Sequence, residues 1–189
     1  MTEKTHYFLA VRLPDSIKKA LNETIGRLQN HFSFQRWVHP EDYHITLAFL
    51  GFANENQIND IKELVPKYIQ AEKSFSLTIS QLGIFGMKTS PRIFWAGLNE
   101  SKELQTLRNK VYFACEQAGF QLEKRAFHPH ITLARKWSTE EAFHPVLLES
   151  TNVFREAPLI FHATDVVLYK TNLLQTPKYE NLITFSLHS

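Results

Sequence analysis

Cysteine is almost absent from this sequence. The 189 residues include a single cysteine, Cys115, which excludes an internal disulfide and a zinc site built from cysteine thiolates. Such sparse cysteine suits a reducing compartment, and we expect the protein to be cytoplasmic. Cys115 lies in a stretch with helical periodicity, so we interpret it as a small core residue rather than a nucleophile.

Long apolar runs and strong net charge are also lacking. No stretch reaches the roughly 20 apolar residues of a membrane span, and Met1 to Tyr7 lacks the charged region and apolar run of a signal peptide. We therefore expect no membrane association. The formal net charge of +2 is too small for strong nonspecific binding along a phosphate backbone. Any contact with nucleic acid should be local, for example at a strand end.

Strand and helix patterns alternate along the chain in two passes. Alternating or short apolar runs predict strands at 7–13, 43–52, 75–82, 92–98, 130–136, 159–163, 165–169 and 182–187, and apolar stripes predict helices at 17–28, 58–69 and 101–118. A loop containing Gly83, Gly86 and Pro91 should join 75–82 to 92–98. Ser138 with Glu141 matches a capping box and predicts a short helix.

The pattern of elements predicts an α+β protein with antiparallel sheets, because strands outnumber helices and are mostly joined by short turns. No linker rich in Pro, Gly or Ser divides the sequence. We therefore expect residues 1–189 to form one domain composed of two lobes.

A repeated string carries the chemistry. The sequence His-Ile-Thr-Leu-Ala occurs at 44–48 and again at 130–134, once in each half of the chain. Residues two apart in a strand project from the same face. His44 should therefore share a face with Thr46, and His130 with Thr132, while the intervening apolar residues point into the cores.

Two histidines and two threonines that converge on one point would suit a phosphodiester. A neutral imidazole can take a proton from water while a protonated one gives a proton to the leaving oxygen. Threonine hydroxyls can donate hydrogen bonds to the non-bridging oxygens as charge develops. This chemistry requires no metal.

Two plainer interpretations compete with this one. A single His-x-Thr on a strand is more simply a structural pair, because threonine is common in strands, whereas two copies with matching flanks favour function. The nine histidines, with His128 close to His130, also raise the possibility of a metal site. The chain has no His-Glu-x-x-His motif and no carboxylate in either repeated string, so we expect no metal and no other cofactor.

These residues resemble the 2H phosphoesterase superfamily, and within it the bacterial and archaeal RNA 2′,3′-cyclic phosphodiesterases formerly called 2′–5′ RNA ligases. The resemblance covers nearly the whole chain, through residues 8–14, Trp37, 44–51, 91–95 and 127–135. It implies a bilobal pseudo-twofold fold, with two antiparallel sheets facing a central cleft and helices outside. We expect a monomer.

The same resemblance implies the reaction and its substrates. RNA ends or nucleotides bearing a 2′,3′-cyclic phosphate would be hydrolysed to a 2′-phosphate. His44 would be the proton donor to the leaving 3′ oxygen and His130 the proton acceptor that activates water, with 2′–5′ joining of RNA ends as a reverse activity. Alternatives are a phosphodiesterase for a small cyclic nucleotide or ADP-ribose cyclic phosphate, and a noncatalytic RNA-end binding protein.

Residues near the repeated strings are candidates for substrate binding. Arg125 and Arg135 flank the second string, and a guanidinium suits a phosphate. Arg135 has the parity opposite to His130, so it reaches the cleft only if the strand is bulged or ends there. Phe49 and Phe127 are candidates for stacking on a base, with core packing as the alternative.

Overall fold

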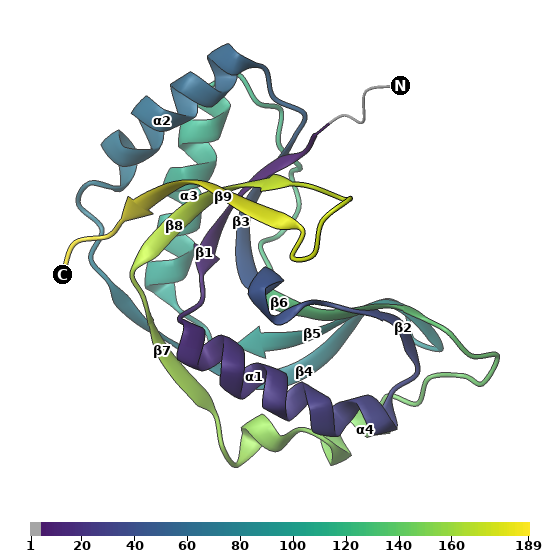
Figure 1. Ribbon diagram of the computed structural model, residues 1–189. Coiled ribbons are helices and arrows are strands. Elements are labelled where there is room, and N and C mark those ends of the chain that lie inside the picture. The colour runs from purple at the N-terminus through teal and green to yellow at the C-terminus, as the bar shows by residue number, and fades with distance from the viewer. Residues whose placement is uncertain (1–4) are drawn as a thin grey trace.

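Two antiparallel sheets form the framework of the protein (Figure 1). The computed structural model describes residues 5–189, so part of the segment Met1 to Tyr7 lies outside the described residues. In spatial order, the four-stranded sheet contains β3 (His44–Gly51), β1 (Tyr7–Arg12), β8 (Asp165–Thr171) and β9 (Tyr179–Ser186). The five-stranded sheet contains β2 (Phe34–Trp37), β6 (His130–Trp137), β5 (Ser90–Leu98), β4 (Phe75–Met87) and β7 (Leu159–Ala163).

The two sheets repeat the same pattern. The strand that carries each His-x-Thr string, β3 or β6, pairs with an earlier strand of the chain, β1 or β5, which pairs on its other side with β8 or β4. The order β3-β1-β8-β9 thus matches β6-β5-β4-β7, and β2 adds one strand outside β6. The predicted α+β fold with two antiparallel sheets in pseudo-twofold arrangement is confirmed.

The helices are exchanged between the two sheets. The main helices are α1 (Asp15–Leu28), α2 (Glu55–Ile69) and α3 (Lys102–Gln117). Shorter elements are the helix α4 (Val146–Ser150) and the 3-10 turns η1 (Gln29–His31), η2 (Pro40–Asp42) and η3 (Val153–Arg155). Although α1 follows β1, it lies alongside the five-stranded sheet; α3 follows β5 but packs with α2 against the four-stranded sheet (Figure 1). One apolar cluster contains buried residues of both sheets.

The predicted loop between the strands at 75–82 and 92–98 is wrong. β4 continues to Met87 and β5 begins at Ser90. Gly83 lies within β4, where the Trp95 ring covers it. The position requires glycine because a Cβ there would stand 2.1 Å from a ring carbon. Gly86 has φ +102° beside a shift in register. Both glycines therefore mark a close approach and a bulge, which resemble loop signals in a sequence.

The predicted short helix at Ser138 and Glu141 is also wrong. Ser138 Oγ donates to the carbonyl of Ser33 at 2.6 Å, and the Glu141 carbonyl accepts from Trp137 Nε1 at 2.8 Å. Both residues hold a loop against the end of β6, and the helix α4 begins later, after Pro145.

Two sequence interpretations concern the interior and the membrane. Cys115 lies on α3 with no exposed surface, which confirms it as a small core residue. None of the helices between residues 5 and 189 combines the length and apolar character that crossing a bilayer requires.

Candidate active site

The two His-x-Thr strings meet in one pocket. β3 and β6 approach each other between the sheets (Figure 1), and each begins at its histidine. Thr46 from β3 and His130 from β6 both line a cavity of about 580 Å³. His44 reaches this wall through Thr46, because His44 Nε2 and Thr46 Oγ1 are 3.0 Å apart. Thr132 is half-buried beside them on β6.

The same β-bulge interrupts both strands. In β3, Thr46 and Ala48 pair with two residues that are adjacent in β1, so Leu47 between them is the extra, unpaired residue of the bulge. In β6, Thr132 and Ala134 pair with two residues that are adjacent in β5, so Leu133 is the extra residue of this bulge. Each bulge turns two successive apolar residues into the core and reverses the alternation that follows. The residue after it, Phe49 in β3 and Arg135 in β6, therefore shares the face of the histidine and threonine.

Both imidazoles are held in the same way. His44 Nδ1 lies 2.7 Å from the carbonyl of Asp42, and His130 Nδ1 lies 2.7 Å from the carbonyl of His128. A carbonyl can only accept, so each Nδ1 carries the proton and Nε2 of the neutral ring has a free lone pair. Both catalytic candidates therefore present Nε2 as the atom that exchanges a proton, and Thr46 Oγ1 donates to it in His44.

Burial makes both histidines weak bases. The pKa of His44 is lowered from 6.5 to about 4, mainly by desolvation, with the charges of His130 and Arg135 contributing and the hydrogen bond to Asp42 acting in the opposite direction. Desolvation also lowers the pKa of His130, with Arg135 and Arg125 contributing. Both shifts favour the neutral imidazole. A bound phosphate anion would favour the imidazolium and raise both pKa values.

The pKa of His44 can be tested directly. We expect NMR titration of the labelled imidazole to show that His44 stays neutral well below pH 6.5, and that inorganic phosphate raises its pKa. The folded pKa lies below the unfolded one, so its contribution to stability is full above about pH 6.5 and is lost as the pH falls through about 4. The variant His44→Gln should lose this part of the pH dependence. Titration of His44 near pH 6.5 in the phosphate-free protein would contradict the prediction.

Aromatic rings enclose each histidine. The His44 ring centroid lies 4.7 Å from that of Phe8 and 5.2 Å from that of Tyr179. His130 is flanked by Phe85, with centroids 4.9 Å apart, and by Trp95 at 6.3 Å. These apolar walls explain the desolvation of both imidazoles, and they restrict the rotation of each ring.

Two arginines near the second string occupy different settings. Arg135 is half-buried, and after desolvation its charge is one of the causes that lower the pKa of both histidines, so it lies close to both imidazoles. Arg125 lines the pocket, with a side chain 84% exposed and Nε 2.8 Å from Glu123 Oε2. Because β6 is bulged, Arg135 faces the cleft, whereas Arg125 lies at the rim.

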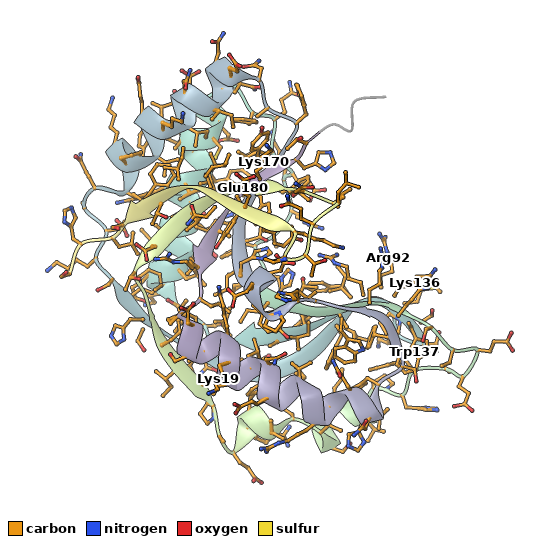
Figure 2. The ribbon with its side chains drawn as sticks, viewed as in Figure 1. Lys19, Arg92, Lys136, Trp137, Lys170 and Glu180 are labelled. Atoms are coloured by element: carbon orange, nitrogen blue, oxygen red, sulfur yellow. The ribbon has the colours of Figure 1, made fainter. Side chains whose placement is uncertain are left out.

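Phe49 and Phe127 both line the pocket. Phe49 is 59% exposed and offers an open ring face, whereas Phe127 is half-buried and packs against the core. Arg92, for which the sequence indicated no role, also lines the pocket. It lies near Lys136 at one end of the five-stranded sheet (Figure 2), and it adds a positive charge to the lining.

Sequence reasoning missed Asp42. Its carbonyl orients His44, and its carboxylate, in a residue only 5% exposed, accepts from the backbone N–H of Lys178 at 2.9 Å and of Tyr179 at 3.1 Å. Asp42 thereby joins the start of β3 to the start of β9 and holds Tyr179 beside the His44 ring. The only sequence signal was an acidic residue two positions before the histidine.

Replacing Asp42 with alanine should destabilise the fold. The backbone N–H groups of Lys178 and Tyr179 would lose an acceptor in partly buried hydrogen bonds, which typically costs about 1 kcal/mol each, and Tyr179 would lose its anchor beside His44. We expect a lower urea midpoint and a slower reaction. The variant Asp60→Ala, at an exposed position on α2, is the control. Equal midpoints for the two variants would contradict this assignment.

The site contains no evident metal centre. Within residues 5–189, no group of three or more His, Cys, Asp or Glu side chains is arranged to hold a metal ion. His128 and His130 have ring centroids 6.4 Å apart, and His128 packs edge-on against Trp95 at 4.9 Å. The His128 ring is therefore a wall of the pocket, while its carbonyl orients His130.

Comparison with known proteins gives a consistent set of relatives. The family described as the 2′-5′ RNA ligase superfamily matches residues 13–173. A Geobacillus stearothermophilus protein named RNA 2′,3′-cyclic phosphodiesterase is 43% identical over 185 residues, covering 98% of this chain and 58% of that relative. The chain thus spans little more than half of that relative's length. A Bacillus subtilis (strain 168) protein of the same name is 36% identical over 184 residues, covering 97% of each chain.

A solved structure shares the fold. The crystal structure of E. coli LigT complexed with 3′-AMP superposes with a TM-score of 0.76, at 24% sequence identity, over 99% of this chain and 100% of that one. The likeness extends over both sheets and their exchanged helices, because nearly every residue is covered.

Proposed function

Because the chain belongs to the 2′-5′ RNA ligase superfamily, we propose that it is an RNA 2′,3′-cyclic phosphodiesterase, which hydrolyses cyclic phosphate ends of RNA to 2′-phosphates. The observation that carries the proposal is that Thr46, from the first string, and His130, from the second, line the same pocket. Each histidine there is held through Nδ1 by a carbonyl, with Nε2 available. Relatives that bear the name of this activity support it.

The reaction follows from the two imidazoles. Neutral His130 accepts a proton from water at Nε2 as the water oxygen attacks phosphorus. Protonated His44 donates a proton from Nε2 to the 3′ oxygen as the bond between phosphorus and that oxygen breaks. The products are a 2′-phosphate and a free 3′ hydroxyl, and the two histidines have exchanged protonation states. The assignment of acid and base rests on the family resemblance.

The depressed pKa of His44 is compatible with its role as acid. An imidazolium with a low pKa is a stronger acid, which favours protonation of the alkoxide leaving group. The bound phosphate supplies the negative charge that raises this pKa enough for the proton to be held before reaction. Thr46 Oγ1, which donates to His44 Nε2 in the free site, can then turn to a phosphate oxygen.

The threonines and Arg135 stabilise the charge that develops on phosphorus. Thr46 and Thr132 donate from hydroxyls to non-bridging oxygens, and the Arg135 guanidinium can donate two hydrogen bonds to a phosphate. These donors make a divalent metal unnecessary. Arg125 at the rim and the open ring of Phe49 are suited to the RNA adjoining the cyclic phosphate.

A product assay on a dinucleotide with a 2′,3′-cyclic phosphate tests this function. We expect a single 2′-phosphate product and the same rate in EDTA. A 3′-phosphate product, or loss of activity in EDTA that zinc restores, would overturn the mechanism. Faster turnover of a cyclic mononucleotide or of ADP-ribose cyclic phosphate would favour the alternative substrates. Tight binding without turnover would indicate a noncatalytic RNA-end binding protein.

We further infer that the protein acts as a cytoplasmic monomer. The site is assembled from side chains of one chain, so a second copy is not needed to complete it. The lone cysteine is buried, and sparse cysteine is typical of proteins in a reducing compartment. Size-exclusion chromatography with light scattering measures the oligomeric state.

A further inference from the structure

A further cation faces the active-site pocket from a helix that the proposed chemistry does not use. Arg108 lies on α3 and lines the same cavity as Thr46 and His130. No feature of the repeated strings points to it, because it lies 22 residues before the second histidine. Its position extends the pocket's positive charge beyond the histidines.

The Arg108 side chain is held in place by two aromatic rings. Its guanidinium carbon lies 3.8 Å from the Tyr112 ring centroid and 5.4 Å from that of Phe127. The Tyr112 hydroxyl donates to the Glu123 carbonyl, so the supporting ring is itself anchored. Cation–π contacts of this kind orient a guanidinium without consuming its N–H donors. Arg108 is thus preorganised, unlike an arginine on an exposed surface.

Arg108 also has donors to spare. Its Nε is buried and has no hydrogen-bond partner, and its Nη1 lies 3.5 Å from Asn109 Oδ1, at the outer limit of a hydrogen bond. Across residues 5–189 no carboxylate forms an ion pair with it. A half-buried guanidinium without an anion is costly unless a ligand supplies one.

The anion that suits Arg108 differs from the reacting phosphate. Arg135 follows the second histidine on β6, whereas Arg108 is held on α3 against Tyr112 and Phe127. Arg108 lies against the ring of Phe127, which precedes His130 by three residues. An RNA end carries a second phosphate close to the cyclic one, on the 5′ oxygen of the same nucleotide.

We propose that Arg108 binds the 5′ phosphate of the nucleotide that carries the cyclic phosphate, and so makes the enzyme prefer RNA ends to 5′-hydroxyl cyclic mononucleotides. This inference rests on the proposed function and deepens it. The guanidinium donates hydrogen bonds to the phosphate oxygens, while the open ring face of Phe49 is available to an adjoining base. Arg108 contributes to substrate binding and takes no part in proton transfer.

Two small substrates isolate the contact. One is a 2′,3′-cyclic mononucleotide with a 5′ hydroxyl, and the other is the same nucleotide with a 5′ phosphate. The wild-type enzyme should show a KM at least about tenfold lower for the 5′-phosphorylated substrate, the usual scale for a charged hydrogen bond. Arg108→Met, which keeps the apolar volume between the rings, should abolish that preference and leave kcat and KM for the 5′-hydroxyl substrate within about twofold.

Two control variants separate charge from packing. Arg108→Lys keeps the charge and should retain part of the preference, whereas Lys102→Met removes an exposed charge from the same helix and should leave the preference intact. If Arg108→Met impairs both substrates equally, Arg108 has only a structural role and the proposal fails. An unchanged preference in Arg108→Met overturns it as well.

A binding measurement keeps this test independent of turnover. Calorimetry compares a nucleoside 2′-monophosphate with the matching 2′,5′-bisphosphate, which are the two expected products. Arg108→Met should weaken binding of the bisphosphate alone by at least about tenfold. If the wild-type protein hydrolyses neither cyclic substrate, the proposed function fails, while the calorimetric comparison still decides whether Arg108 binds the 5′ phosphate. Equal weakening of both nucleotides, or of neither, would reject the site.

Discussion

Replacement of His44 or His130 with alanine should reduce hydrolysis of a cyclic-phosphate dinucleotide by at least about a hundredfold, the usual scale for losing a general acid or base. Either change removes one of the two groups that exchange a proton with water or with the leaving oxygen. The effect should fall on kcat, because Thr46, Thr132 and Arg135 still hold the phosphate. Initial rates of product formation, separated by chromatography, measure it.

A histidine elsewhere on a strand provides the matched control. His162 lies on β7 at an exposed position, and His162→Ala should retain wild-type activity. Circular dichroism of all three variants checks that the sheets are intact. The two active-site variants should also each lose one limb of the pH–rate profile, because each lacks one titrating group. Full activity in either His44→Ala or His130→Ala would refute the two-histidine mechanism.

Replacement of Arg135 with methionine should lower kcat by about a hundredfold, similar to the loss of one donor that stabilises a developing oxyanion. Methionine keeps most of the apolar volume beside Tyr179, so the change removes charge and hydrogen bonds rather than packing. The pKa of both histidines should rise in the variant, because the Arg135 charge lowers them. NMR titration and steady-state kinetics measure the two effects.

The control for Arg135 is an arginine remote from the cleft. Arg27 is exposed in the last turn of α1, and Arg27→Met should leave kcat unchanged. Arg135→Lys should recover part of the rate, because an ammonium supplies charge but lacks the paired donors of a guanidinium. A variant Arg135→Met whose kcat matched the wild type would show that the bulge brings no useful group to the phosphate.

The repeated string allowed much of the site to be predicted from sequence. Five matching residues in each half indicated two equivalent strands, and the period of two placed each histidine on the face of its threonine. The antiparallel sheets followed from the excess of strands over helices and from the short turns between them. These inferences depend on local sequence patterns. They succeed because the period of two along a strand is set by local backbone geometry.

Features that depend on pairing between distant segments could not be predicted. The period of two puts Arg135 on the wrong face, because the extra residue Leu133 appears only when β6 is aligned with β5. Gly83 resembled a loop residue until the Trp95 ring was seen to cover it. Asp42 holds backbone groups 136 positions away, and Arg108 enters the pocket from α3. None of these relations leaves a periodic signal.

The order of pairing also governs when the active site can form during synthesis. β1 pairs with β3 on one edge, and its other edge is covered by β8 (Asp165–Thr171), which is translated after both histidines. Tyr179, which walls His44, is translated later still. A nascent chain that already contains both histidines therefore still lacks the strands and the Tyr179 ring that enclose His44. Cleavage should therefore begin only after β8 and β9 have been translated and have joined the four-stranded sheet.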